Sequence, residues 1–185
     1  WVSRGGMKLE KAILEYNLDC SLIIGLDIGA STGGFTDVLL TKGAKKVYAV
    51  DVGYGQLDWK LRQDKRVVVK EKTNARFLSD QIIKDPLDVI VCDASFISLK
   101  KILPSGIKFL KKNGWLAALI KPQFEVGKGL VGKGGVVRDS DLHKEVINDI
   151  KGWIESEMKM NLLGVVESPI LGPSGNKEFV IVETK

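Results

Sequence analysis

The sequence has few of the residues that build disulfide frameworks, zinc centres or histidine-based catalytic triads. Its 185 residues include two cysteines, Cys20 and Cys92, and one histidine, His143. Two cysteines in apolar stretches are typical of small buried side chains in a reducing compartment. A single histidine excludes most zinc sites and makes a Ser-His-Asp arrangement improbable. We therefore expect no metal site, and we expect His143 at an ordinary helix-surface position.

Long apolar runs are also missing. No window approaches the roughly 18 to 20 consecutive apolar residues that a membrane span needs. The first ten residues are mostly polar and basic, which is not the pattern of a signal peptide. These absences predict a cytoplasmic protein with no stable membrane span and leave its oligomeric state open. A start at Trp1 instead of methionine suggests a fragment of a longer chain.

The composition is that of one globular domain, with 44% hydrophobic and 28% charged residues in a length that can bury a sizeable core. The formal net charge is +5. A net positive charge is compatible with a nucleic-acid partner but is weak evidence for one by itself.

Short apolar runs alternate with helix-like stretches along most of the chain. Such runs, separated by helices, indicate a parallel sheet covered on both faces. Predicted strands are residues 22–28, 46–50, 66–70, 87–92 and 115–120, and predicted helices are residues 7–16, 34–41, 56–62, 99–111 and 139–157. Near the end, residues 161–167 and 178–183 form two strand-like runs with no helix between them, which predicts an antiparallel pair at the sheet edge. The pattern is that of class I methyltransferases, a Rossmann-like α/β fold with a mostly parallel seven-stranded sheet and an antiparallel last strand.

A glycine-rich turn lies between the first predicted strand and the first helix of this sheet. In open parallel sheets ligands bind beyond the carboxyl ends of the strands, and glycines let a ligand approach the backbone. Amides at the start of the helix can then meet a carboxylate, while the acid before the first glycine suits a ligand with an ammonium group. The predicted cofactor-binding residues of the turn are Asp27, Gly29, Ala30, Ser31, Thr32, Gly33, Gly34 and Phe35.

A second carboxylate, Asp51, ends the second predicted strand, where an acidic side chain commonly accepts ribose hydroxyls. We add Val52, Asn74 and Asp93 to the cofactor-binding set. The glycine spacing is not the G-x-G-x-x-G of dinucleotide-binding proteins. The combination favours S-adenosyl-L-methionine, and a tight turn without a ligand is the alternative.

The segment 127–134 reads G-K-G-L-V-G-K-G, close to the phosphate-loop pattern. It lacks the final hydroxyl residue and does not open a helix, so a flexible basic loop is the better interpretation. Lys128, Lys133 and Arg138 are then candidates for contact with a nucleic-acid backbone, and we add Arg4 to them.

Four further polar residues are expected to converge beside the cofactor: Lys8, Asp93, Lys121 and Glu178. Methylation of a ribose hydroxyl requires removal of its proton, and a lysine acts as a base only when burial or a second ammonium lowers its pKa. Lys121 is the expected base. Each residue also has an ordinary alternative, because a lysine is usually a solvated surface group, Asp93 can cap a turn, and Glu178 can protect a sheet edge.

Several motifs together resemble the TlyA-type hemolysin/ribosomal RNA methyltransferases. These are Ser3-Arg4-Gly5-Gly6-x-Lys8-Leu9, Gly29-Ala30-Ser31-Thr32-Gly33-Gly34-Phe35-Thr36-Asp37, Asp51-Val52-Gly53-Tyr54-Gly55-Gln56, Lys121-Pro122-Gln123-Phe124 and Gly175-Asn176-x-Glu178. The core of that family is similar to the FtsJ-type RNA 2′-O-methyltransferases, whose Lys-Asp-Lys-Glu tetrad falls by motif on the four residues above.

The resemblance implies methyl transfer from S-adenosyl-L-methionine to the ribose 2′-oxygen of cytidine in ribosomal RNA, with ribosomal RNA or ribosomal subunits as partners. It implies that residues 1–185 are the FtsJ-like methyltransferase domain, and that a small S4-type RNA-binding domain precedes it in the full-length protein. Two other classes stay open: a dinucleotide-dependent oxidoreductase, and a hemolysin-like membrane-active or non-catalytic RNA-binding protein that uses the same scaffold.

Overall fold

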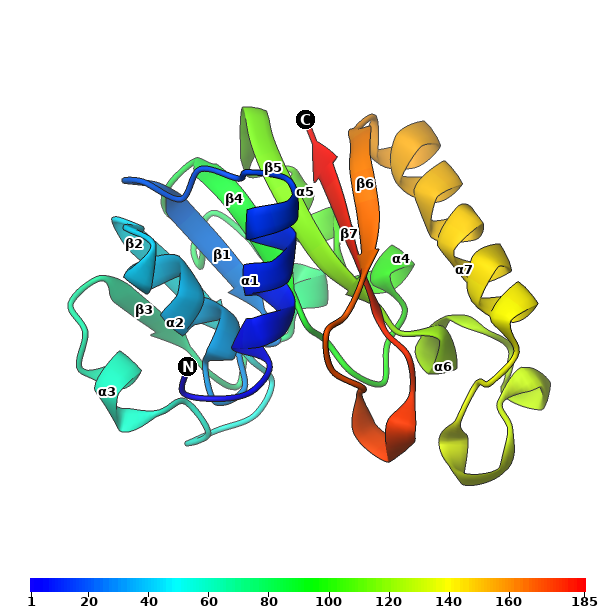
Figure 1. Cartoon of the computed structure of the whole chain (residues 1–185). Helices are drawn as coiled ribbons and strands as arrows, with labels where there is room; N and C mark the ends of the chain where they lie inside the picture. Colours follow the sequence, from blue (N-terminus) through cyan, green and yellow to red (C-terminus); the bar gives the residue numbers. More distant parts are fainter.

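A computed structural model describes residues 1–185, which fold around one seven-stranded sheet of order β3-β2-β1-β4-β5-β7-β6 (Figure 1). Strand β7 is antiparallel to both of its neighbours, and the other neighbouring pairs are parallel. The strands are β1 (Ile24–Ile28), β2 (Lys46–Val50), β3 (Val67–Lys70), β4 (Leu87–Cys92), β5 (Leu110–Ile120), β6 (Asn161–Glu167) and β7 (Phe179–Thr184). The predicted fold class, with its antiparallel last strand, is confirmed.

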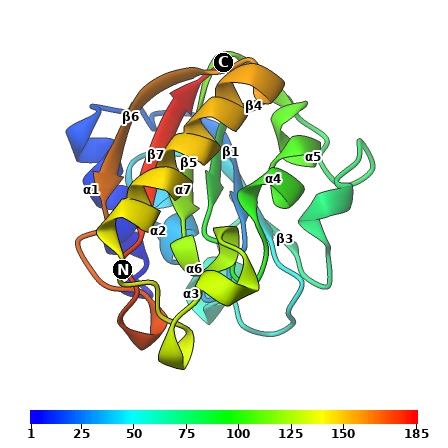
Figure 2. The ribbon, with the colours of Figure 1, turned by 90° about the vertical axis from the view of Figure 1, so that its right-hand side faces the viewer.

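Helices cover both faces of the sheet, and Figures 1 and 2 show α1 and α2 on one face and α4, α5 and α7 on the other. The α-helices are α1 (Gly6–Glu15), α2 (Gly34–Thr41), α3 (Trp59–Arg62), α4 (Leu99–Ile102), α5 (Pro104–Ile107), α6 (Pro122–Glu125) and α7 (Ser140–Trp153). Successive side chains of a strand point to opposite faces. Val89 and Val91 accordingly pack in the core beside α1 and α2, whereas Ile90 packs in the other core.

Three predicted helices differ from the structure by more than one residue, and α1 is displaced by one residue from its predicted bounds. The single helix expected over residues 99–111 is two short helices, because Pro104 has no N–H to continue the first one. The strand after it begins at Leu110, five residues before the predicted start. Helix α3 begins only at Trp59, since the Asp58 side chain caps it by accepting a hydrogen bond from the Lys60 amide. Helix α7 begins after Asp139, which caps it, and ends in a π-helical turn at Ile154–Met158.

The expectation for His143 was wrong. The side chain is buried, with 6% of its surface exposed, and its Nε2 lies 2.7 Å from the Val137 carbonyl oxygen. The ring also meets Phe179 edge-on, with ring centroids 5.6 Å apart. Helical periodicity places a residue on a face, but it does not reveal which loop folds back over that face.

The register of the parallel strands brings their carboxyl ends to one edge of the sheet. Ile28 pairs with Val50 on one side and with Cys92 on the other, and Cys92 pairs with Ala118. The residues that follow β1, β2, β4 and β5 therefore meet at that edge. It is the edge at which open α/β sheets bind their ligands.

Candidate active site

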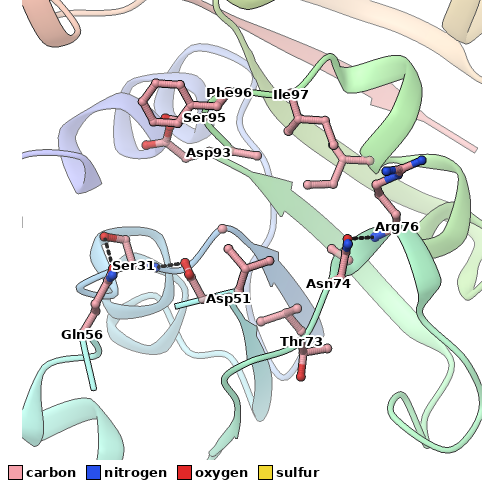
Figure 3. A pocket seen from close by; sticks show the side chains of 16 residues that line it. Ser31, Asp51, Gln56, Thr73, Asn74, Arg76, Asp93, Ser95, Phe96 and Ile97 are labelled. Carbon is pink, nitrogen blue, oxygen red and sulfur yellow. Dashed lines mark hydrogen bonds between the residues drawn. The ribbon is translucent and has the colours of Figure 1, made fainter. Parts of the chain in front are cut away.

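Two adjoining cavities open at the carboxyl edge of the sheet. The larger, of about 520 Å³, is lined by the ends of β2 and β4 and by residues 73–76 (Figure 3). The smaller, of about 230 Å³, is lined by the glycine turn, the N-terminal segment and Lys121. Both cavities share Gly29, Ser31, Asp93 and Ser95. A ligand with two parts can thus extend from one cavity into the other.

The glycine turn follows the course that the sequence predicts. Gly29 has a φ of 78°, and a β-carbon there would lie 2.9 Å from the Asp93 carbonyl oxygen. Of the predicted turn residues, all except Gly33 line one or both cavities. Gly33 instead has a φ of 102° directly before α2, where Leu57 and Leu61 pack against its α-carbon. Its function is to turn the chain into the helix.

Asp51 is fixed by the backbone. Its two carboxylate oxygens accept hydrogen bonds from the amides of Ser31 at 2.8 Å and Gly53 at 2.7 Å. These bonds hold the carboxylate at the wall of the larger cavity, where Figure 3 shows it beside Ser31. Each oxygen keeps lone-pair capacity for a further donor. The arrangement suits a pair of ribose hydroxyls.

Asp27 is fully buried at the floor of the smaller cavity. One carboxylate oxygen accepts a hydrogen bond from the Thr36 hydroxyl at 2.7 Å, and the other has no partner. Burial, followed by the charges of Asp93 and Asp51, raises the pKa of Asp27 to about 7. A buried carboxylate with an unused oxygen is a good partner for a ligand ammonium group, since their pairing offsets the cost of burying each charge.

The other two cofactor predictions lie at the larger cavity. The Asn74 side-chain oxygen accepts a hydrogen bond from the Arg76 amide, 3.0 Å away, and the residue lines the cavity. Val52 also lines it and is 70% exposed. An apolar side chain held at the mouth of a pocket can cover one face of a planar ring.

Four side chains form a continuous chain of ion pairs in and beside the smaller cavity. Lys121 Nζ lies 2.6 Å from Asp93 Oδ1. Lys8 Nζ lies 3.6 Å from Asp93 Oδ2 and 2.7 Å from Glu178 Oε2. Asp93 therefore stands between two ammonium groups. The structure brings together all four residues that the sequence predicts as catalytic.

Each of the four comes from a different element. Lys8 lies on the buried face of α1, and Asp93, Lys121 and Glu178 adjoin the ends of β4, β5 and β7. Lys8 and Lys121 are only 7% and 5% exposed, so neither is a solvated surface lysine. Glu178 is fully buried beneath Gly172, where a β-carbon would collide with its carboxylate.

Two residues beside the predicted ones, Ser95 and Phe96, were not predicted from the sequence. The Ser95 hydroxyl accepts a hydrogen bond from Lys121 Nζ at 2.9 Å and lines both cavities. Phe96 is 90% exposed with a φ of 64°, and its ring centroid lies 5.0 Å from that of Phe124. The only indication of Ser95 and Phe96 in the sequence was their position two and three residues after Asp93. A bulky residue in left-handed backbone beside a cavity is uncommon and points to function.

The four predicted RNA-contacting residues do not line either cavity. Lys128, Lys133 and Arg138 are exposed on the loop between α6 and α7, and Arg4 lies in the turn before α1. None of them forms an ion pair within the chain. The phosphate-loop-like segment contains short 3-10 turns and does not open an α-helix, as expected for a basic loop.

Solved structures place the fold in one class. The chain superposes on an Aeropyrum pernix fibrillarin with bound S-adenosyl-L-methionine with a TM-score of 0.65 and 16% identity, covering 98% of this chain and 74% of that one. At that identity the likeness shows the fold alone, that of S-adenosylmethionine-dependent methyltransferases. A protein from Lactococcus lactis with a provisional hemolysin designation gives a TM-score of 0.95 at 47% identity, covering 100% of this chain and 88% of that one.

The sequence comparison defines the family. The model for "FtsJ-like methyltransferase" matches residues 1–185, and the chain belongs to that family. It is 48% identical to the 16S/23S rRNA (cytidine-2′-O)-methyltransferase TlyA of Mycobacterium tuberculosis, covering 98% of this chain and 67% of that protein. It is also 48% identical to Hemolysin A of Brachyspira hyodysenteriae, covering 97% of this chain and 75% of that protein. None of the helices combines the length and the hydrophobicity that a membrane-spanning helix requires.

Proposed function

We propose that this methyltransferase transfers the methyl group of S-adenosyl-L-methionine to the ribose 2′-oxygen of cytidine in ribosomal RNA. The observation that carries the proposal is the chain of ion pairs through Lys8, Glu178, Asp93 and Lys121 beside the cofactor cavities. The relatives from Mycobacterium tuberculosis and Campylobacter jejuni, the latter 34% identical, are both named as rRNA (cytidine-2′-O)-methyltransferases, which supports the cytidine 2′-oxygen as acceptor.

The residues of the two cavities fit the proposed cofactor part by part. Asp51 would accept the ribose hydroxyls, and Val52 and Asn74 would border the base in the larger cavity. The unpartnered oxygen of Asp27 would face the ammonium group of the methionine part. The backbone at Gly34 and Phe35, at the start of α2, lines the smaller cavity, and its amides suit the carboxylate. When bound, the cofactor supplies an electrophilic methyl group on a sulfonium centre.

We assign Lys121 as the group that takes the proton from the ribose hydroxyl. Asp93 and Ser95 both contact its Nζ, and Lys121 lines the smaller cavity. Asp93 also faces Lys8, 3.6 Å away, but Lys121 has the shorter contact with it, at 2.6 Å. Glu178 balances the charge of Lys8. Much of the remaining rate gain would come from holding the hydroxyl in line with the methyl group.

Features around the cavities suit an unpaired, single-stranded nucleotide. The exposed ring of Phe96 at the cavity wall offers a stacking surface for a base. Arg4, Lys128, Lys133 and Arg138 offer unpaired positive charge for phosphates. A cytoplasmic location, where ribosomal RNA and ribosomal subunits are the partners, is part of the proposal. An S4-type domain in the full-length protein also stays a prediction.

The deciding experiment is a methyl-transfer assay. Purified protein is incubated with radiolabelled S-adenosyl-L-methionine and ribosomal RNA or subunits, and the modified nucleotide is mapped by nuclease digestion and mass spectrometry. We expect one or a few 2′-O-methylcytidines. Methylation on a base, or none with any ribosomal substrate, would contradict the proposal. Calorimetry with NAD tests the oxidoreductase alternative, and a lysis assay with the Lys121→Ala protein and no cofactor tests the membrane-active one.

A further inference from the structure

A basic arm, which we define as residues 127–135, extends beyond the carboxyl edge of the sheet. Five of its nine residues are glycine, and it carries Lys128 and Lys133 but no acidic residue. Gly134 and Gly135 have φ values of 75° and 77°, and a β-carbon on either would meet open space. These glycines are therefore present for backbone freedom and not for close packing. By itself such an arm would sample many positions.

The arm is tied down at its far end by a pair of buried side chains. The Val137 amide donates to Asn176 Oδ1 at 3.0 Å, and the Val137 carbonyl oxygen lies 2.7 Å from His143 Nε2. A second bond from Asn176 reaches the Gly135 carbonyl oxygen at 2.9 Å. Val137, His143 and Asn176 are each 6% exposed or less. Because a carbonyl oxygen only accepts, His143 must carry its proton on Nε2. We call these three residues the latch.

The latch holds the arm against the loop that leads to Glu178. Asn176 Nδ2 also donates to the Pro173 carbonyl oxygen at 3.3 Å, and Pro173 lines the smaller cavity. Figures 1 and 2 both show the arm and this β6–β7 connection side by side below the sheet. At its other end the arm follows α6, which begins directly after Lys121. Both ends of the arm are thus fixed beside catalytic residues.

We propose that the latch of His143, Val137 and Asn176 is a positioning device that presents Lys128 and Lys133 to the phosphate backbone of the RNA next to the reacting nucleotide. The inference rests on the proposed function, since it takes RNA as the substrate. A phosphate contact made from a freely moving loop loses most of its benefit to the entropy of ordering that loop. Because the fold already fixes both ends of the arm, the arm loses less conformational entropy when it binds RNA.

The experiment compares RNA binding by five variants of the chain, one of which combines His143→Ala with the replacement of Lys128 and Lys133 by alanine. His143→Ala removes one bond of the latch, and His143→Gln keeps a side-chain N–H that can reach the same carbonyl oxygen. Val146→Ala is the matched control, because Val146 is equally buried on the same helix, 6% exposed, and does not contact Val137 through a hydrogen bond. Lys128→Ala/Lys133→Ala removes the charges. Filter binding to deproteinised ribosomal RNA gives Kd, and calorimetry with S-adenosylhomocysteine reports the cofactor site.

We expect His143→Ala to raise the RNA Kd about fivefold and the double lysine variant to raise it about tenfold. The variant that combines His143→Ala with the two lysine substitutions should have nearly the same Kd as the double lysine variant, because both changes remove the same phosphate contact. His143→Gln should restore most of the affinity, and S-adenosylhomocysteine binding should be unchanged throughout. If His143→Ala binds RNA as Val146→Ala does, or if its effect simply adds to that of the lysines, the latch is not a positioning device. Failure of the proposed function is a separate outcome, in which the wild-type chain transfers no methyl group to RNA.

Discussion

Lys121 Nζ and Asp93 Oδ1 lie 2.6 Å apart at the ends of two neighbouring parallel strands, β5 and β4. The strand register makes this contact, because residues that follow paired strands emerge at the same edge of the sheet. Lys121 also donates to Ser95 on the loop that continues from Asp93. The pair therefore links the sheet to the cavity in which the methyl acceptor is proposed to bind, and it is the first target for mutation.

Replacing Lys121 by alanine should abolish methyl transfer and leave cofactor binding nearly intact. Removal of a general base lowers turnover by at least about a hundredfold, whereas the lysine is not among the residues proposed to hold the cofactor. Turnover on ribosomal RNA and calorimetric affinity for S-adenosylhomocysteine are the two measurements. Lys144→Ala is the control, since Lys144 is exposed on α7 and forms no ion pair. Unchanged turnover in the Lys121 variant would contradict the assignment of Lys121 as the general base.

Cofactor affinity should rise with pH across neutrality because of Asp27. Burial raises the pKa of its carboxyl to about 7, so below that pH the free protein must release a proton before it can pair with an ammonium group. Affinity should fall up to about tenfold for each pH unit below 7 and level off above about pH 8. Calorimetry with S-adenosylhomocysteine at several pH values measures this slope. An Asp27→Asn variant should bind weakly with a flat profile, and a slope equal to that of the wild type would assign the titration to another group.

Gly29 should be irreplaceable for reasons beyond its backbone conformation. Gly29→Ala places a methyl group 2.9 Å from the Asp93 carbonyl oxygen, at a φ of 78°. Gly55→Ala is a matched control, because Gly55 has a φ of 71° and open space around its α-carbon. The control should cost only the left-handed strain, about 1 kcal/mol. The Gly29 variant should lose more stability in denaturant unfolding and also lose cofactor affinity. Equal losses in the two variants would show that the close approach is unimportant.

Glu183 should make the fold less stable as pH rises. It is 1% exposed on β7, and neither carboxylate oxygen has a hydrogen-bond partner. Burial, followed by the charge of Glu155, raises the pKa of Glu183 to about 7 from an ordinary value of 4.5. The folded state therefore holds its proton while the unfolded state releases it, so the contribution of Glu183 to stability is most favourable below pH 4.5 and declines until about pH 7.

The neutral variant Glu183→Gln tests this assignment. It should gain roughly 2 to 3 kcal/mol over the wild type at pH 8 and little at pH 4. Urea unfolding at the two pH values gives both numbers. Glu155→Gln should give a small gain in the same direction, because Glu155 is the second cause of the shift. A gain for Glu183→Gln that is the same at pH 4 and pH 8 would rule out titration as the cause.

Much of the fold was predictable because its signals are local. Short aliphatic runs marked β2, β4 and β6 with the observed bounds, and the carboxyl-edge rule placed Asp51 and Asp93 at one site. The predicted helix over residues 99–111 takes no account of Pro104, which separates α4 from α5. The start of α3 depended on the Asp58 cap, which is a weak signal in a polar loop.

The remaining features depend on contacts between distant segments. Ser95 is hydrogen-bonded to Lys121 only because two loops meet in space, and no spacing in the sequence encodes that meeting. The same holds for His143 and Asn176, which bury themselves on Val137 from α7 and from the β6–β7 connection. Lys8 and Glu178 were expected to converge beside the cofactor, and the motif resemblance matched both to the tetrad; their contact of 2.7 Å agrees with that expectation.

That contact joins residues 170 positions apart, and the strand beside Glu178 lies inside the sheet between β5 and β6. The ion-pair network is therefore among the last features that the folding chain can complete, because it needs α1, near the start of the described residues, and β7, near their end, to be in place together.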